Sequence, residues 1–218
     1  MTILNPQLVS VNVGKTEPLE GQGKTVSSAI NKKPVQKELY LSKDQLQGDE
    51  QADKKNHGGE EKAICVYPQE HYSYWEDQLN CTLPPSAFGE NITVKGLLET
   101  DTYIGDIFTW GDAIVQVCQP RIPCHKLEKR FGKEGIPQKV IETGFTGYYM
   151  RVLKEGKVSL DAPFVFKERT TNFSISFVND VYHRDKDDIE KTKALVDTKE
   201  LASGWRENMS RRLHKTSN

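Results

Sequence analysis

The sequence predicts a mainly β protein, a β-barrel with a few peripheral helices, followed by a small appendage of three helices. Two observations support this fold class. From Leu8 to about Phe166, short apolar runs are broken by glycine, proline and aspartate, and several joints between the runs are typical of hairpins. After Arg169, glycine and proline become rare and three short amphipathic segments follow. We therefore expect a barrel domain over residues 1–169 and a three-helix extension over residues 170–218.

Alternation of apolar and polar residues defines the strands of the predicted barrel. The clearest candidate strands comprise residues 9–13, 103–110, 114–118, 150–153 and 157–160. Gly111-Asp112 and Glu155-Gly156 are short joints of the kind that closes a β-hairpin. We expect each of these two joints to connect a pair of neighbouring antiparallel strands.

One helix is predicted inside the barrel domain. Pro68 suits a first helical turn, and large apolar residues recur at helical spacing from Tyr67 to Leu79, just before Asn80. His71 belongs to this stripe. We interpret it as a histidine packed among aromatic side chains rather than as a metal ligand.

Three further helices are predicted after Arg169. Ser174 can cap the first, Asp187 can open the second, and a regular apolar stripe runs along the third from Leu201 to Leu213. This last stripe could pack on the barrel, on a second copy of the chain or on an electron-donor protein. We favour packing within the chain.

Composition limits the classes of function. The 218 residues include 30 lysines and arginines against 31 aspartates and glutamates, and the charges are interspersed, which disfavours nucleic acid and anionic membranes as partners. No stretch approaches the roughly 20 apolar residues that span a bilayer. The N-terminal residues lack the pattern of a signal peptide, so we expect a cytoplasmic protein. Four cysteines without a CxxC pair are typical of free thiols in a reducing compartment.

The most informative stretch is residues 119–127, where Cys124 follows two prolines and Arg121 at the end of an alternating apolar run. Because proline cannot donate a backbone hydrogen bond, the strand should stop here and present Cys124 in a cleft. Arg121, His125 and Lys126 would favour the thiolate, which is the form that attacks electrophiles or binds metal. A reactive thiol is our interpretation, and a packed one is the alternative.

Glycine-containing turns form a second group of candidate site residues. His57 leads into Gly58 and Gly59, whose backbone N–H groups could form an anion-binding turn. Ser28 and Lys32 belong to a cluster of hydroxyl and lysine side chains that could hold a phosphate. The alternative for both is a solvated turn. Residues 21–25 have the wrong spacing for a nucleotide-binding phosphate loop, so we exclude an NTPase.

Taken together and in order, these elements resemble the MOSC-domain family, named for the C-terminal domain of molybdenum-cofactor sulfurase, in its YiiM-like branch. The resemblance covers nearly the whole chain and rests on residues 28–32, 48–53, 57–59, 88–91, 105–106 and 119–124. It implies a MOSC-type β-barrel, and the predicted C-terminal helices are similar to the three-helix extension of that branch.

The resemblance also implies the molybdenum cofactor (molybdopterin), with Cys124 as the metal ligand. Cys124, His57 and Glu90 are then the candidate catalytic residues. The candidate cofactor-binding residues are Ser28, Lys32, Asp49, His57, Gly58, Gly59, Phe88, Gly89, Asn91, Gly105, Asp106 and Arg121. The implied reaction is reduction of small N-hydroxylated compounds, such as hydroxylaminopurine base analogues, to amines. Because the sequence shows no flavin, haem or iron–sulfur signature, we expect a separate electron-donor reductase; a homodimer is compatible with the sequence.

Two alternatives remain open. In the first, the chain carries molybdenum cofactor or sulfur on Cys124 without turning over a substrate. In the second, Cys124 is the nucleophile of a hydrolase with His57, His71 or His125 as base, although no nucleophile motif supports it. For the remaining cysteines, we expect Cys65 and Cys118 to be small core residues and Cys81 to be exposed at a helix end.

Overall fold

The computed structural model describes residues 6–21, 25–52 and 58–216, and a curled, open sheet dominates these residues. The strands of this sheet are β1 (Gln7–Val13), β4 (Lys33–Pro34), β6 (Ile64–Pro68), β7 (Ile92–Lys95), β8 (Ile107–Trp110), β9 (Ala113–Pro120), β10 (Tyr148–Lys154) and β12 (Phe164–Glu168). Their order is β12-β8-β9-β10-β6-β7-β1-β4. Only the central pair β6 and β7 is parallel among the described pairs. The predicted mainly β fold is confirmed.

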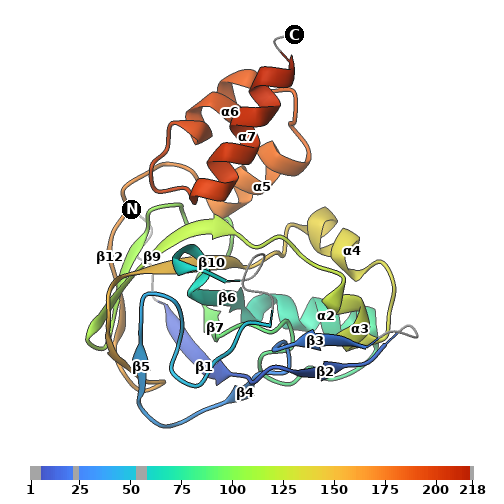
Figure 1. Ribbon diagram of the computed structural model, residues 1–218, viewed down its shortest axis with the longest axis vertical. Coiled ribbons are helices and arrows are strands. Elements are labelled where there is room, and N and C mark those ends of the chain that lie inside the picture. The colour runs from blue at the N-terminus through green and yellow to red at the C-terminus, as the bar shows by residue number, and fades with distance from the viewer. Residues whose placement is uncertain (1–5, 22–24, 53–57, 217–218) are drawn as a thin grey trace.

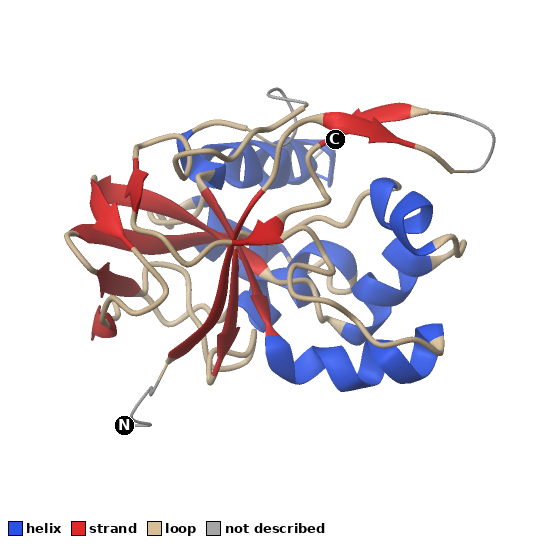
Figure 2. Cartoon of the chain, turned by 90° about the horizontal axis from the view of Figure 1, so that it is seen from below, coloured by secondary structure: helices blue, strands red, loops and turns tan. Residues whose placement is uncertain are grey.

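Short ribbons and helices complete the barrel domain. The two small ribbons pair β2 (Glu17–Leu19) with β3 (Val26–Ser28) and β5 (Leu39–Leu41) with β11 (Gly156–Val158). The helices of this domain are η1 (Glu60–Lys62), η2 (Gln69–His71), α2 (Tyr72–Leu79), α3 (Lys126–Phe131) and α4 (Ile136–Thr143). In Figure 1, α2, α3 and α4 lie together at one side of the sheet. Seen from below, most strands gather on one side of the molecule and most helices on the other (Figure 2).

Two hydrophobic clusters hold the barrel domain together. The larger one lies under the curled sheet and includes Ile64, Val66, Tyr148 and Met150, all with no exposed surface. The smaller one surrounds Trp75 of α2. Because each large apolar side chain contributes roughly 1.5–3 kcal/mol when fully buried, these clusters position the strands that border the pocket described below.

The predicted helix is present but starts later than expected. Pro68 is the last residue of β6, and the 3₁₀ turn η2 separates it from α2, so the helix proper begins at Tyr72. Asn80 ends the helix in the left-handed conformation, with φ of 53°. His71 is buried, stacks on Phe145 and bonds Glu99 at 2.7 Å, which confirms it as a packed histidine.

Of the two predicted hairpins, one is present. Trp110 of β8 pairs with Ala113 of β9 across Gly111-Asp112, as expected. The second prediction is wrong, because β11 pairs with β5 and not with β10. Glu155 accepts hydrogen bonds from the backbone N–H of Lys43 and the hydroxyl of Tyr40, which directs the chain toward β5 instead of back along β10.

The three predicted C-terminal helices are present as α5 (Ile175–His183), α6 (Ile189–Val196) and α7 (Ser203–Thr216), and they form a separate lobe above the sheet in Figure 1. Ser174 caps α5 by accepting from the N–H of Phe177. The N-cap of α6 is Asp188, one residue after the predicted start. None of the helices in the described part of the chain is both long and apolar enough to cross a membrane.

Candidate cofactor pocket

The loop that follows β9 carries the first wall of the pocket. Pro120 still pairs with Tyr148, and the N–H of Arg121 then bonds the carbonyl of Gly147 at 3.0 Å. After this point the chain leaves the sheet and reaches α3, whose first turn begins with the bond from the N–H of Leu127 to the carbonyl of Cys124. Cys124 is half-buried and free, whereas Arg121 is only 8% exposed.

The central strands β6 and β10 form the second wall. Cys65 and Tyr149 are directly opposite each other in the antiparallel register, so their side chains emerge on the same face. Their neighbours along each strand point into the core. Burial raises the pKa of the Cys65 thiol, and the hydroxyl of Tyr149 is its hydrogen-bond neighbour. Burial also raises the pKa of Tyr149, so both groups keep their protons near neutral pH.

A buried carboxylate organises the third wall. Asp49 is 2% exposed and forms an ion pair with Lys32. It also accepts from the N–H of Gly14 at 2.9 Å and from the side-chain amide of Asn91 at 2.8 Å. The amide oxygen of Asn91 in turn accepts from the N–H of Cys65 at 3.0 Å. This network links the third wall to the second.

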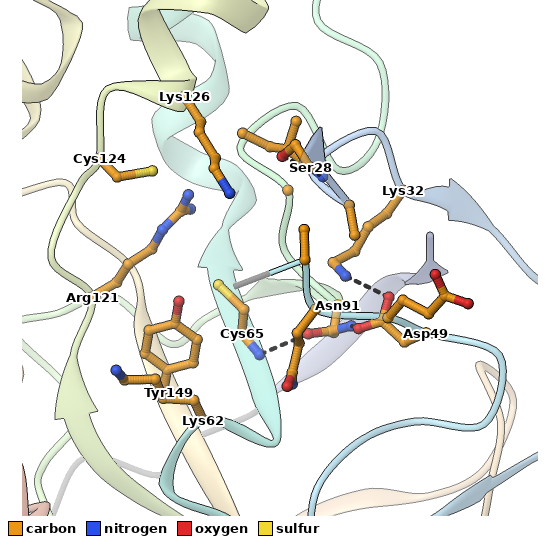
Figure 3. Close-up of a pocket in the computed structure, with 16 residues that line it drawn as sticks. Ser28, Lys32, Asp49, Lys62, Cys65, Asn91, Arg121, Cys124, Lys126 and Tyr149 are labelled. Atoms are coloured by element: carbon orange, nitrogen blue, oxygen red, sulfur yellow. Dashed lines mark hydrogen bonds and ion pairs between the residues drawn. The ribbon is translucent and has the colours of Figure 1, made fainter. Parts of the chain in front are cut away.

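The three walls enclose one pocket. Figure 3 shows the side-chain ends of Arg121, Cys124 and Lys126 converging in it, with the Tyr149 hydroxyl and the Cys65 thiol directed toward them. Among the residues that the structure describes, no carboxylate forms an ion pair with Arg121. Burial lowers the pKa of Arg121, but Cys65, Tyr149 and Cys124 in their ionised forms raise it, so the pKa lies above its usual value and the guanidinium stays charged. A buried cation of this kind is costly unless an anion neutralises it, so the pocket suits an anionic group.

Comparison with known proteins places the chain in a family. The family model described as the MOSC domain matches residues 53–165, and the model described as the YiiM-like 3-alpha helix domain matches residues 174–216. The chain belongs to the MOSC-domain family. The recognised resemblance to its YiiM-like branch is thereby confirmed.

Two relatives and one solved structure show how far the likeness extends. Protein YiiM of Escherichia coli (strain K12) is 41% identical over 221 residues, which is 94% of this chain and 97% of that protein. The crystal structure of YiiM from Geobacillus stearothermophilus superposes with a TM-score of 0.82 at 38% identity and covers 96% of this chain and all of that one. A protein named Reductase from Gibberella moniliformis (strain M3125 / FGSC 7600) is 35% identical over 144 residues, 62% of this chain but 25% of that protein.

Several site residues predicted from the sequence line the pocket. Besides Arg121 and Cys124, these are Ser28, Lys32, Asp49, Gly89 and Asn91. Gly89 has φ of 77°, and a Cβ atom on it would lie 2.6 Å from a side-chain carbon of Ile30, so glycine is required at this close approach. Gly58 and Gly59 line a neighbouring groove rather than the pocket itself. His57 lies outside the described residues.

Glu90 and Phe88 are placed elsewhere, which corrects two predictions. Glu90 has no exposed surface and accepts hydrogen bonds from Tyr72, Thr93 and the N–H of Phe88, so it supports the 88–91 turn from behind and does not line the pocket. Phe88 stacks on Tyr67 with the ring centroids 4.2 Å apart. Its ring belongs to the smaller hydrophobic cluster and is not a pocket contact.

Gly105 and Asp106 also lie away from the pocket. The fully buried carboxylate of Asp106 is paired with Arg169 through bonds of 2.7 and 2.9 Å. A Cβ atom on Gly105 would lie 2.1 Å from the hydroxyl of Thr170. The 105–106 turn therefore joins the barrel to the segment that leads into α5, and its predicted role in cofactor binding is not supported.

The pocket lining also includes residues that were not among the predicted site residues, and the most informative of them are Cys65, Tyr149 and Lys62. Cys65 is buried, as expected of a core residue, yet its side chain faces the pocket. The signal that identifies it is the pairing of β6 with β10, which sets Cys65 opposite Tyr149. That pairing depends on the register of strands about 80 residues apart, and local sequence patterns do not contain it.

Proposed function

We propose that this MOSC protein binds the molybdenum cofactor in the described pocket, with Cys124 as the thiolate ligand of the metal, and reduces N-hydroxylated compounds to amines. The observation that carries the proposal is the half-buried thiol of Cys124 beside the buried guanidinium of Arg121, which no described carboxylate pairs. MOSC domains are associated with binding of this cofactor in general.

The donor set fits the group. A soft thiolate suits a sulfur-rich metal site, and the cofactor is an anion because it carries a dithiolene and a phosphate. Arg121 and Lys126 point into the pocket from one side, and Lys32 lines it from the other (Figure 3). Their charges would offset those of the bound anion, and the guanidinium of Arg121 can hold an anionic group through two parallel hydrogen bonds.

When bound, the cofactor supplies the two-electron redox chemistry needed to break an N–O bond. The overall balance is one hydroxylamine group, two electrons and two protons giving one amine and one water. In the proposed site, Cys124 would hold the metal, while Asp49 fixes Lys32 and Asn91. The protonated hydroxyl of Tyr149 is available to donate a hydrogen bond within the pocket.

The proposal includes a separate reductase as the source of the electrons and a small N-hydroxylated molecule as the substrate. The likeness to the Gibberella moniliformis protein named Reductase, which covers 62% of this chain and 25% of that protein, supports oxidoreductase chemistry. The substrate class comes from the resemblance to the YiiM-like branch. Both therefore need a direct assay.

The test is to purify the protein without oxygen and to measure molybdenum per chain together with reduction of 6-hydroxylaminopurine by a chemically reduced viologen dye. Cys124→Ala should lose most of the bound molybdenum and reduce activity by at least about 100-fold, because it removes the ligand. Cys81→Ala is the matched control, since Cys81 is a free, exposed cysteine outside the pocket. It should keep both properties.

The same measurement separates the proposal from cofactor or sulfur carriage. Bound molybdenum without turnover in the wild-type protein would favour a carrier. Full molybdenum content and full activity in Cys124→Ala would reject the proposed ligand.

A further inference from the structure

A cavity lies between the barrel domain and α5, and it shares no lining residue with the cofactor pocket. On the barrel side, this α5 cavity is bordered by His71 and by residues of the segments 98–100 and 141–145; on the other side, it is bordered by one face of α5, from Ser176 to Arg184. Its volume is about 140 Å³. Because an apolar cavity of about 150 Å³ can hold benzene, the α5 cavity is large enough for a molecule with one aromatic ring.

A buried histidine–carboxylate pair forms part of the barrel side. His71 and Glu99 are each 4% exposed, and Nε2 of His71 lies 2.7 Å from a carboxylate oxygen of Glu99. The imidazole also stacks on the ring of Phe145, with the centroids 3.8 Å apart. Because a carboxylate accepts, Nε2 carries a proton, and Nδ1 is the acceptor of the neutral ring. Nδ1 has no hydrogen-bond partner among the residues that the structure describes.

Asn179 of α5 brings a second unpaired acceptor to the cavity. It is 5% exposed, and its side-chain amide donates to the hydroxyl oxygen of Thr146 at 2.9 Å. That hydroxyl donates its only proton to the carbonyl of Gly147 at 2.8 Å, so it can only accept from Asn179, which fixes the orientation of the amide. In the described part of the chain, Oδ1 of Asn179 is then left without a partner. A ligand that donates a hydrogen bond would remove this cost of about 1–3 kcal/mol.

The charged residues of the cavity favour a cation. The side chains of Asp180 and Arg184 are 40% and 52% exposed, so they form its rim. The guanidinium of Arg184 already donates to Asp180 at 2.5 Å and to the carbonyl of Glu142 at 2.8 Å. Of the described residues that line the cavity, Glu99 and Asp180 are carboxylates, whereas Arg184 is the one arginine or lysine. A ligand with a positive charge complements this set better than an anion does.

The cavity and the cofactor pocket are supported by the same peptide group. The N–H of Gly147 donates to Glu99 at 2.7 Å, and the carbonyl of Gly147 accepts from the N–H of Arg121 at 3.0 Å. A ligand that contacts Glu99 is therefore one peptide group away from the loop that carries Arg121 and Cys124.

We infer that the α5 cavity is a binding site for a small protonated amine with a compact apolar body. An ammonium group has three N–H donors and no acceptor, which matches the unpaired acceptors on His71 and Asn179. The apolar body would pack on Leu98, Ile141 and Phe145, which line the same space. This site uses neither the cofactor nor the proposed reaction, so the two proposals can fail separately.

The first test is a titration of the full-length ¹⁵N-labelled chain with benzylamine, followed by two-dimensional NMR. Saturable shifts should appear in the backbone signals of Gly144 and Gly147 and in the side-chain amide of Asn179. The backbone signal of Gly89, which lines the cofactor pocket, should not move. Benzoate, which is similar in size but negatively charged, should bind at least about tenfold more weakly. If neither Gly144 nor Gly147 shifts, or if benzoate binds as tightly as benzylamine, the inference is wrong.

Two variants then test the polar groups. Asn179→Leu removes the unpaired acceptor at similar side-chain volume and should weaken benzylamine binding about tenfold. Asp180→Asn removes a charge at the exposed rim without altering a buried group, so it tests the site even if Asn179→Leu does not fold. It should weaken benzylamine binding about threefold and reduce the preference over benzoate. Asp187→Asn is the matched control, since Asp187 is exposed in the same helical extension and does not line the cavity. Equal affinity in wild type and in all folded variants would overturn the inference, whatever the outcome of the molybdenum and activity measurements.

Discussion

Two walls of the pocket each present a cysteine, but the two cysteines stand in different local structures. The first is the loop wall, residues 119–126, where prolines end the backbone hydrogen bonding of β9 and Cys124 is exposed beside Arg121. The second is the sheet wall, formed by Cys65 on β6 and Tyr149 on β10. Cys124 is half-buried and Cys65 is 5% exposed. The same residue type is thus accessible on one wall and packed and protonated on the other.

The difference lies in what surrounds each sulfur. On the sheet wall, Cys65 is flanked along its strand by Ile64 and Val66, which have no exposed surface, and burial raises the pKa of its thiol. On the loop wall, Cys124 opens toward both the pocket and the groove. Accessibility, and not mere proximity to the pocket, therefore decides which cysteine is suited to hold a metal.

The sharpest way to break this comparison is to measure the reactivity of the two thiols directly. In a Cys81→Ala background, iodoacetamide should modify Cys124 at least about 1,000-fold faster than Cys65, because Cys65 must first be exposed by local opening of the sheet. Peptide mass spectrometry of the native protein over time gives both rates. Comparable rates for the two cysteines would show that the sheet wall is not closed.

The buried charge on the loop wall gives the second test. Arg121→Met should weaken the apparent affinity for the proposed cofactor about 100-fold, because it removes the cation that would neutralise the cofactor's negative charge. At limiting cofactor, this appears as a lower molybdenum content per chain. The substitution should also raise the melting temperature of the cofactor-free protein, since an unpaired buried charge is costly.

Arg130→Met is the control for Arg121→Met. Its guanidinium donates to the carbonyls of Ile30 and Ser86 and to the side chain of Asn31, so its loss should lower the melting temperature. Opposite signs in the two variants distinguish an unpaired cation from a satisfied one. A lower melting temperature in cofactor-free Arg121→Met would contradict our account of the pocket.

The third test concerns the Asp49 network of the third wall, which is linked to the sheet wall through Asn91. Asp49→Asn should destabilise the protein by about 3 kcal/mol, because Lys32 would remain buried without its carboxylate. Urea unfolding followed by circular dichroism measures this change in the free energy of unfolding. Glu50→Gln is the control: Glu50 pairs with Lys15 at the surface, so its effect should be much smaller. Equal effects would mean that the Asp49 network contributes no more to the free energy of unfolding than a surface ion pair does.

The loop wall could be predicted from the sequence, whereas the sheet wall could not. Prolines, an arginine and a cysteine within six residues define a local structure, because each acts on its own backbone or on a close neighbour. Cys65 and Tyr149 meet only through strand pairing, and the register that aligns them is set by the packing of the whole sheet. Local patterns likewise predicted the β8–β9 hairpin but misassigned β11.

Acidic residues beside glycines show the same limit. Glu90 and Asp106 each follow a glycine in a tight turn, and from the sequence both look like site residues. The structure uses both as buried anchors: Glu90 bonds Tyr72, 18 residues earlier, and Asp106 bonds Arg169, 63 residues later. Asp49 has a similar sequence setting but lines the pocket. What separates the three is the identity of distant partners, which the local sequence does not contain.

The smallest predicted effect is a pH dependence from Cys118, a buried thiol of β9 that does not line the pocket. Burial raises its pKa from 9.0 to about 11. The native state therefore holds this proton more tightly than the unfolded state, so the stability it contributes is fully present below about pH 9 and is lost as the pH rises toward 11. Its size is roughly 3 kcal/mol. The free energy of unfolding, measured from pH 8 to 11, should therefore fall less steeply with pH in Cys118→Ala than in wild type. The two slopes should differ by an amount that corresponds to at most about one bound proton. Cys81→Ala is the control: it removes an exposed thiol and should leave the slope unchanged. Identical slopes in wild type and Cys118→Ala would show that Cys118 is not shielded from water in the folded protein.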